Sequence, residues 1–320
     1  MSAGIEALLA RRLLLVTGKG GVGRSVVSAA LALAALRRGQ RVLLLEANPG
    51  AQARAEALLD RGPVGTGLTD LEPRLWAASM DPRAALREYI TLKFRFRFVY
   101  DRAFDNRFAR AFLRAVPGMD DLLLLGKALH HVRERDRRTR APRFDLVVLD
   151  APATGHGVPF LKLPQVILEA VRVGPMRKEA LWMQGLLEDP AITAMVLVAL
   201  PEELPARETI ELHRLARKEL RLSQGALVIN RMLPPPFPDA ASRLFRTVAG
   251  CARRSCPEAR GLIAAATLAG EIRTEQARER KRLRQEVRLP TFELPELGVG
   301  ELGRSELELL VRHLESGRGR

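Results

Sequence analysis

Short apolar runs alternate with longer helical patterns along most of the chain. The runs of strand length are "RRLLLVT", "RVLLLEA", "RFDLVVLDAP", "AMVLVALP", "GALVINRMLP" and "RLPTFELPEL", the first leading directly into a glycine-rich loop. Helical patterns such as "RSVVSAALALAALRRGQ" and "PARETIELHRLARKELRL" separate them. This alternation predicts an α/β fold with three layers, in which helices cover both faces of a mostly parallel sheet. Ligands of such folds bind at the carboxyl ends of the strands.

Residues 83–142 interrupt this alternation and are expected to form a helical insertion. Eight of the fifteen aromatic residues lie between Tyr89 and Phe112. Phe104, Phe108 and Phe112 are four residues apart, which places them on one helix stripe. "KFRFRF" alone could stack nucleic-acid bases, but helical packing is favoured.

The insertion divides the expected nucleotide-binding domain into two segments. Residues 1–82 form its first part and residues 143–320 the rest, with a second helical excursion near 165–190. The N-terminal apolar run is read as a strand and not as a signal peptide.

The formal charge of +15 does not by itself indicate a nucleic-acid-binding protein. The basic residues are scattered, and acidic residues interrupt both basic runs, at 133–143 and 278–288. Solvated helix faces are therefore favoured over a nucleic-acid surface. No stretch reaches the ~18–20 uncharged residues of a membrane span. With only two cysteines, Cys251 and Cys256, we expect no disulfide framework and a cytoplasmic protein.

The loop at residues 18–25, "GKGGVGRS", fits two phosphate-binding patterns. It satisfies G-x-G-x-x-G, and Glu46 ends the next strand at the spacing of a dinucleotide-binding fold. Lys19 and Arg24 instead place positive charge at the loop, as a P-loop requires. Ser25 stands where a P-loop hydroxyl binds Mg²⁺, and Asp150 closes a later strand as a second magnesium ligand would. The side chains favour a P-loop NTPase.

Four segments carry a resemblance to a known family. The loop resembles the deviant Walker A motif of the ATPases that include ArsA, the tail-anchored-protein targeting (GET) ATPases and the MinD/ParA proteins. "DAPATGHGVPFLKLP" (150–164) is similar to switch II of the ArsA/GET branch. "VINRMLP" (228–234) resembles that branch's adenine-side strand end, and "ELPELGVGELG" (293–303) resembles its closing segment next to the P-loop. The aromatic insertion resembles a bacterial side branch of paired, heterodimer-forming ArsA-like ATPases.

The resemblance implies roles for individual residues. Lys19 would reach across a dimer interface to the partner's nucleotide, and Ser25 would hold Mg²⁺, with Asp150 doing so through water. The implied cofactors are ATP and Mg²⁺, and the implied partners are a second copy or a paralogous ATPase, and a hydrophobic protein client or membrane partner. The implied nucleotide-binding residues are Gly18, Lys19, Gly20, Gly21, Val22, Gly23, Arg24, Ser25, Asn230 (toward adenine) and Pro295.

Two departures from the family pattern bear on hydrolysis. Arg24 replaces the loop lysine; it keeps the positive charge that binds a nucleotide, but its larger planar guanidinium is expected to disturb the geometry at the γ-phosphate. Asn48 stands where the switch I aspartate orients the attacking water, and an amide cannot take a proton. We therefore predict an ATP-binding switch with weak or absent hydrolysis, in which Lys19, Asp150 and Asn48 are the catalytic positions.

Other readings remain open. An active ATPase that targets hydrophobic or membrane proteins would need Glu46, or a partner residue, in place of Asn48. A ParA-like DNA-binding ATPase would use the positive charge, and a dehydrogenase is the fourth reading. Cys251 and Cys256 match neither a metalloid site nor a zinc-bridged dimer. His156 belongs to the switch II segment, and His130 and His131 are expected on a helix surface.

Overall fold

A sheet of eight strands lies at the centre of the described part of the chain. The computed structural model describes residues 3–47, 54–94, 118–136, 138–152, 157–235 and 259–317. The strands are β1 (Leu13–Gly18), β2 (Val42–Glu46), β3 (Thr69–Glu72), β4 (Leu75–Ser79), β5 (Leu146–Asp150), β6 (Thr193–Ala199), β7 (Gln224–Met232) and β8 (Thr291–Pro295). Their order is β3-β4-β2-β5-β1-β6-β7-β8, and every neighbouring pair is parallel except β3 with β4.

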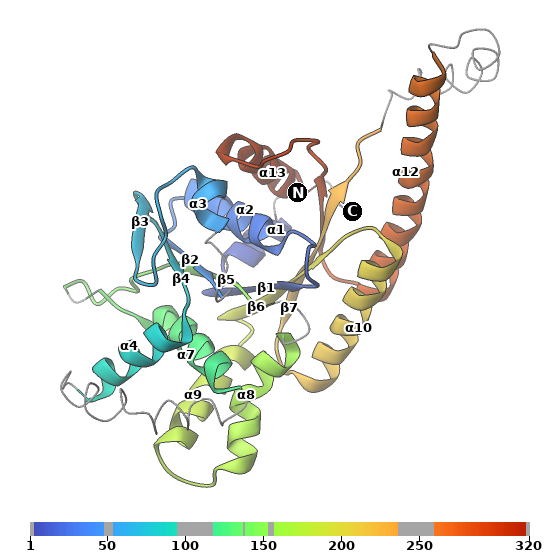
Figure 1. Cartoon of the computed structure of the whole chain (residues 1–320). Coiled ribbons are helices and arrows are strands. Elements are labelled where there is room, and N and C mark those ends of the chain that lie inside the picture. The colour runs from blue at the N-terminus through green and yellow to red at the C-terminus, as the bar shows by residue number, and fades with distance from the viewer. Residues whose placement is uncertain are drawn as a thin grey trace.

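Helices cover both faces of this sheet (Figure 1). One face packs against α1 (Ala3–Leu9), α2 (Arg24–Arg37), α3 (Arg54–Leu59) and α13 (Arg304–Ser316). The other packs against α4 (Pro82–Phe94), α7 (Met119–Arg133), α8 (Gly157–Ala170), α9 (Pro175–Glu188), α10 (Glu203–Glu219) and α12 (Ala259–Val287). Successive strand residues point to opposite faces, so Leu14 and Val16 join the first core and Leu13 and Leu15 the second. The predicted three-layer α/β/α architecture is confirmed.

Two elements differ from the sequence-based expectation. The apolar run that leads into the glycine loop is strand β1, as expected, but helix α1 before it was not predicted, and Ile5, Leu8 and Leu9 of this helix are buried. The antiparallel edge pair β3 and β4 was not predicted at all. Its strands are only four and five residues long, and Arg74, with φ 71°, turns the chain between them. Runs this short carry little periodicity.

Helices α4 and α7 lie at the two ends of the predicted insertion. Residues 95–117, with Phe104, Phe108 and Phe112, lie outside the described residues. Helices α8 and α9 occupy the region of the expected second excursion, where Met183 and Leu187 are buried in the core. The apolar stripe of α9 is therefore largely core. Among the described residues, no helix is long and apolar enough to cross a membrane.

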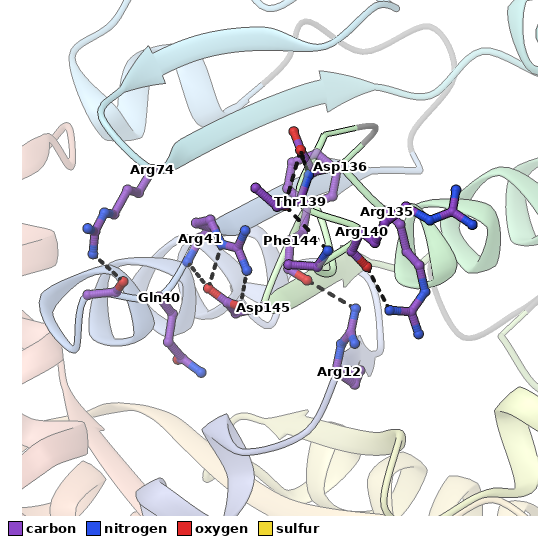
Figure 2. A network of polar contacts seen from close by, with 12 residues as sticks. Arg12, Gln40, Arg41, Arg74, Arg135, Asp136, Thr139, Arg140, Phe144 and Asp145 are labelled. Atoms are coloured by element: carbon purple, nitrogen blue, oxygen red, sulfur yellow. Dashed lines mark hydrogen bonds and ion pairs between the residues drawn. The ribbon is translucent and has the colours of Figure 1, made fainter.

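The amino edge of the sheet is rich in arginines that have partners (Figure 2). Arg41, just before β2, binds both carboxylate oxygens of Asp145, at 2.7 and 3.0 Å. This hydrogen bonding lowers the pKa of Asp145 below its ordinary value. Arg12, just before β1, donates to the carbonyl oxygens of Val132 and Phe144, at 2.7 and 3.0 Å. These cations connect the loops that lead into neighbouring strands.

Candidate nucleotide site

The glycine loop lies between β1 and α2, at the carboxyl edge of the sheet. Gly18 ends β1, and Gly23 is the residue before the first turn of α2. Gly21 and Gly23 have φ values of +85° and +89°, a region that residues with a side chain rarely adopt. The backbone N–H groups at the start of α2 are unsatisfied by the helix itself, which makes this end suited to a phosphate.

Two of these glycines lie against backbone or side-chain atoms, and two face open space. A Cβ at Gly18 would lie 2.4 Å from the carbonyl oxygen of Val198, and one at Gly23 would lie 2.2 Å from Nδ2 of Asn230. A Cβ at Gly20 or Gly21 would meet no atom of the described residues within 4 Å. The loop is therefore packed at its base and open at its tip, as a cradle for an external group requires.

Ser25 and Asp150 meet beneath this loop. Strands β1 and β5 are neighbours, and the register pairs Val16 with Asp150, which brings the end of β5 next to the start of α2. The Ser25 hydroxyl donates to Oδ2 of Asp150 at 2.6 Å, and the two residues are 9% and 5% exposed. A hydroxyl and a carboxylate are oxygen ligands of the kind Mg²⁺ prefers, so this pair fits the ion that the sequence predicts.

Arg24 turns toward the end of β5. Its Nη1 donates to the carbonyl oxygen of Ala151 and lies 3.7 Å from Oδ1 of Asp150. The side chain is 14% exposed. The guanidinium thus partly neutralises the carboxylate that would face Mg²⁺, and its hydrogen bond to a carbonyl restrains it at the strand end.

Glu46 ends β2 directly beside Asp150, its partner in the parallel register. It is 5% exposed. A buried carboxylate at this position fits poorly with a role on an open ribose hydroxyl, which weighs against the dehydrogenase reading. Asn48, two residues further, lies outside the described residues, so its role stays a prediction.

Lys19, at the open tip of the loop, is half-exposed and forms an ion pair with Glu208 of α10, at 2.7 Å. The sequence offered no signal for Glu208, because nothing in its spacing marks it among the other acidic residues of an amphipathic helix. Within this chain Lys19 therefore has a partner of its own.

Asn230 and Pro295 lie at the carboxyl ends of β7 and β8. Asn230 is 4% exposed, and its amide nitrogen donates to the carbonyl oxygen of Val22 at 2.9 Å. Asn230 therefore supports the loop from behind. Contact of either residue with adenine stays a prediction.

The histidines fall into three cases. His130 is exposed as expected, but His131 is 7% exposed, so its expected surface position is wrong. It is buried because it packs edge-to-face on Phe144 and bonds Glu134 through Nδ1 at 2.8 Å. His156, with Cys251 and Cys256, lies outside the described residues. Within the described ranges no group of three or more His, Cys, Asp or Glu side chains could hold a metal.

Comparison with known proteins places this geometry in a family. The family model described as "Anion-transporting ATPase" matches residues 11–183. The chain is 34% identical over 230 residues to "ATPase BagA" of Mycobacterium tuberculosis (strain ATCC 25618 / H37Rv), covering 70% of this chain and 66% of that protein.

Two further relatives are more distant. The "Arsenical pump-driving ATPase" of Escherichia coli is 27% identical to this chain over 247 residues. The aligned region covers 69% of this chain and 39% of that protein. "ATPase GET3" of Rhodotorula glutinis is 26% identical to this chain over 178 residues. The aligned region covers 53% of this chain and 48% of that protein. The chain thus aligns with about two thirds or less of the length of these relatives. Since the family model covers more than half of the chain, this chain belongs to the anion-transporting (ArsA/GET-type) ATPase family.

Proposed function

We propose that this chain is an ATP-binding, magnesium-dependent switch with weak or absent hydrolysis, which works as one subunit of a dimer with a paralogous ATPase. The observation that carries the proposal is the pairing of Ser25 with Asp150 at 2.6 Å beneath an open glycine loop. The adjacent Arg24, bonded to Ala151, is the reason to expect slow turnover.

Binding rests on the backbone and on two side chains. The N–H groups of residues 20–25 would hold the β- and γ-phosphates, and the positive end of the α2 dipole adds to the attraction. Ser25 and Asp150 would hold Mg²⁺, Asp150 through water. When bound, the ion supplies positive charge against the phosphate oxygens.

Hydrolysis needs a cation over the transferring phosphate and a group that orients water. Arg24 must leave the Ala151 carbonyl and Asp150 before it can turn toward a phosphate. Asn48 cannot accept a proton from water, and a general base is typically worth ~10²–10⁴ in rate. Both departures slow the chemical step and leave the phosphate cradle in place.

The ion pair of Lys19 supports a role in a dimer. Exposed pairs of this kind contribute about 0.2–1 kcal/mol, so replacing Glu208 by a partner's phosphate costs little. Lys19 would therefore exchange one anion for another when a nucleotide-loaded partner docks.

Binding can be tested by calorimetric titration with ATP in Mg²⁺ and in EDTA. We expect micromolar binding in Mg²⁺, weakened about tenfold or more by Ser25→Ala, because the hydroxyl ligand is lost. The control is Ser305→Ala, the same change at the exposed start of α13, which should bind as the parent does. Absence of binding to the parent chain would overturn the proposal.

Turnover is tested separately by phosphate release. Asn48→Asp should raise the rate by about 10²-fold if residue 48 positions the attacking water. Asn106→Asp makes the same chemical change inside the insertion and should leave the rate unchanged. An unaltered rate in an Asn48→Asp chain that still binds ATP would remove residue 48 from the mechanism.

A second candidate is an active ATPase that acts on hydrophobic or membrane proteins. Glu46 favours it, since this buried carboxylate lies beside Asp150 and two residues from Asn48. If this second candidate is correct, the parent chain hydrolyses ATP readily, and Glu46→Gln abolishes phosphate release while ATP still binds. If turnover is instead unaffected by Glu46→Gln, Glu46 does not replace Asn48.

A further inference from the structure

A pocket of about 390 Å³ lies at the amino edge of the sheet, at the opposite ends of the strands from the glycine loop. It is formed where α10 and α12 end and where β7 and β8 begin. The two helices are in contact and run side by side in Figure 1. Its volume is within the range of small-molecule sites, which run from about 300 to 1,000 Å³.

Three arginines from separate segments line this pocket. Arg217 is on the last turn of α10, Arg221 is in the loop before β7, and Arg288 follows α12. Among the described residues, none of those that line the pocket carries a carboxylate side chain. The nearby carboxylate of Glu286 is bound by Arg214 at 2.7 Å, and that of Glu219 is bound by Lys162 at 2.7 Å. The positive charge of the pocket is therefore not neutralised by these neighbours.

Hydrogen bonding to helix ends accounts for one of these three arginines and not for the other two. Cations near a helix C-terminus often stabilise it by donating to the last carbonyls. Arg288 does so, with Nε donating to the carbonyl of Gln285 at 3.1 Å. The side chains of Arg217 and Arg221 have no hydrogen bond or ion pair within the described residues. Both arginines thus line the pocket at exposed positions, and no group of the described residues uses their donors.

The remaining wall combines one buried polar group with apolar side chains. His213 is 6% exposed, and its Nδ1 is bonded to Oε1 of Gln224 at 2.6 Å, which leaves Nε2 as the ring nitrogen available to a ligand. Leu220 and Leu289 supply an apolar surface beside the arginines. Guanidinium groups match the oxygen geometry of a phosphate, and the leucines suit a carbon skeleton attached to it.

We propose that this pocket binds a phosphomonoester, with the phosphate held by Arg217, Arg221 and Arg288 and the organic part against Leu220 and Leu289. The site lies apart from the glycine loop and is independent of the nucleotide proposal. A soluble metabolite and the headgroup of phosphatidic acid share this chemistry, and the experiment separates the two.

The test compares the full-length parent chain with two double variants by calorimetric titration of phenyl phosphate. Arg217→Gln/Arg221→Gln removes the two pocket arginines that bond to no other side chain or carbonyl among the described residues. Arg207→Gln/Lys218→Gln removes the same charge from exposed positions of α10 outside the pocket. The glycine loop is intact in all three proteins, so any phosphate bound there contributes equally.

We expect the pocket variant to weaken binding of phenyl phosphate about tenfold or more, since charged hydrogen bonds are lost. The control variant should change it by less than about twofold. Equal affinities in all three proteins, or no saturable binding to the parent chain, would overturn the proposal.

Flotation with phosphatidylcholine vesicles that contain a minor fraction of phosphatidic acid identifies the source. Vesicle binding that only the pocket variant loses, together with the loss of phenyl phosphate binding, assigns the phosphate to a lipid headgroup. Phenyl phosphate binding without vesicle binding assigns it to a soluble ligand. Vesicle binding that both variants lose equally reflects total charge and gives the pocket no part in it.

Discussion

Polar and charged residues gather at both edges of the sheet, but they bond within the chain at the amino edge and surround a glycine loop at the carboxyl edge. At the amino edge, Arg12 and Arg41 are bound to carbonyls and to Asp145, so their charge holds loops together. At the carboxyl edge, the polar groups surround a glycine loop in which a Cβ added at Gly20 or Gly21 would meet no described atom within 4 Å. A cation bonded to groups within the chain stabilises the fold, whereas a polar group beside open space is available to a ligand. Arg24 lies at the carboxyl edge but is bonded like an arginine of the amino edge.

The largest effect is expected at the base of the loop. Gly23→Ala forces a side chain into φ +89° and places its Cβ 2.2 Å from Nδ2 of Asn230. Strain of this kind costs about 1–3 kcal/mol and displaces the loop, so ATP binding by calorimetry should weaken by about 100-fold. Gly62→Ala, where the added Cβ meets nothing within 4 Å, is the control. If Gly23→Ala binds ATP normally, the loop is not packed as described.

The second largest effect is expected from Arg12, at the amino edge of the sheet. Arg12→Met leaves the carbonyls of Val132 and Phe144 without their donor. We expect the free energy of unfolding in urea to fall by about 2–3 kcal/mol, with ATP affinity unchanged in the folded protein. The adjacent Arg11→Met is the control and should cost little. A drop of equal size in both variants would show that Arg12 contributes by burial of its chain alone.

A smaller effect depends on pH. Burial raises the pKa of Glu134, but hydrogen bonds from His131 and Arg143 outweigh it and lower this pKa from 4.5 to about 2. A depressed carboxyl pKa stabilises the fold above pH 4.5, and this contribution is lost as the pH falls toward 2. Glu134→Gln should therefore flatten the acid side of the unfolding curve, by about 1–2 kcal/mol after allowance for solvent screening. If the free energy of unfolding of Glu134→Gln falls with acid pH as steeply as that of the parent chain, the lowered pKa of Glu134 is contradicted.

The smallest effect is that of the ion pair at the loop tip. Glu208→Gln releases Lys19 and should change the free energy of unfolding by less than about 1 kcal/mol. Sedimentation analysis in Mg-ATP then measures association, which the released lysine should strengthen. Glu211→Gln, an exposed position on the same helix, is the control. Weaker association of Glu208→Gln would mean that Glu208 itself belongs to the interface.

Much of the fold and of the site could be predicted because both depend on local patterns. Strands β1, β2, β5, β6 and β7 are continuous apolar runs, as strands covered on both faces must be. The loop glycines are required by backbone geometry, and Ser25 and Asp150 follow from the order of strand and helix. The burial of His131 could not be predicted, because it depends on how the end of α7 packs against Phe144, which lies past the end of that helix. The pairing of Lys19 with Glu208 likewise depends on how α10 packs.

The nucleotide site is assembled from segments that are far apart in the chain. Ser25 bonds a residue 125 positions away, Arg24 one 127 positions away, and Val22 one 208 positions away. Contacts of such long sequence separation form late, since loop closure must precede them. During synthesis the cradle therefore cannot be complete until Asn230 has left the ribosome and β7 has joined the sheet. ATP would then act as a ligand of the finished fold alone, and its binding would stabilise folded chains over unfolded ones by mass action.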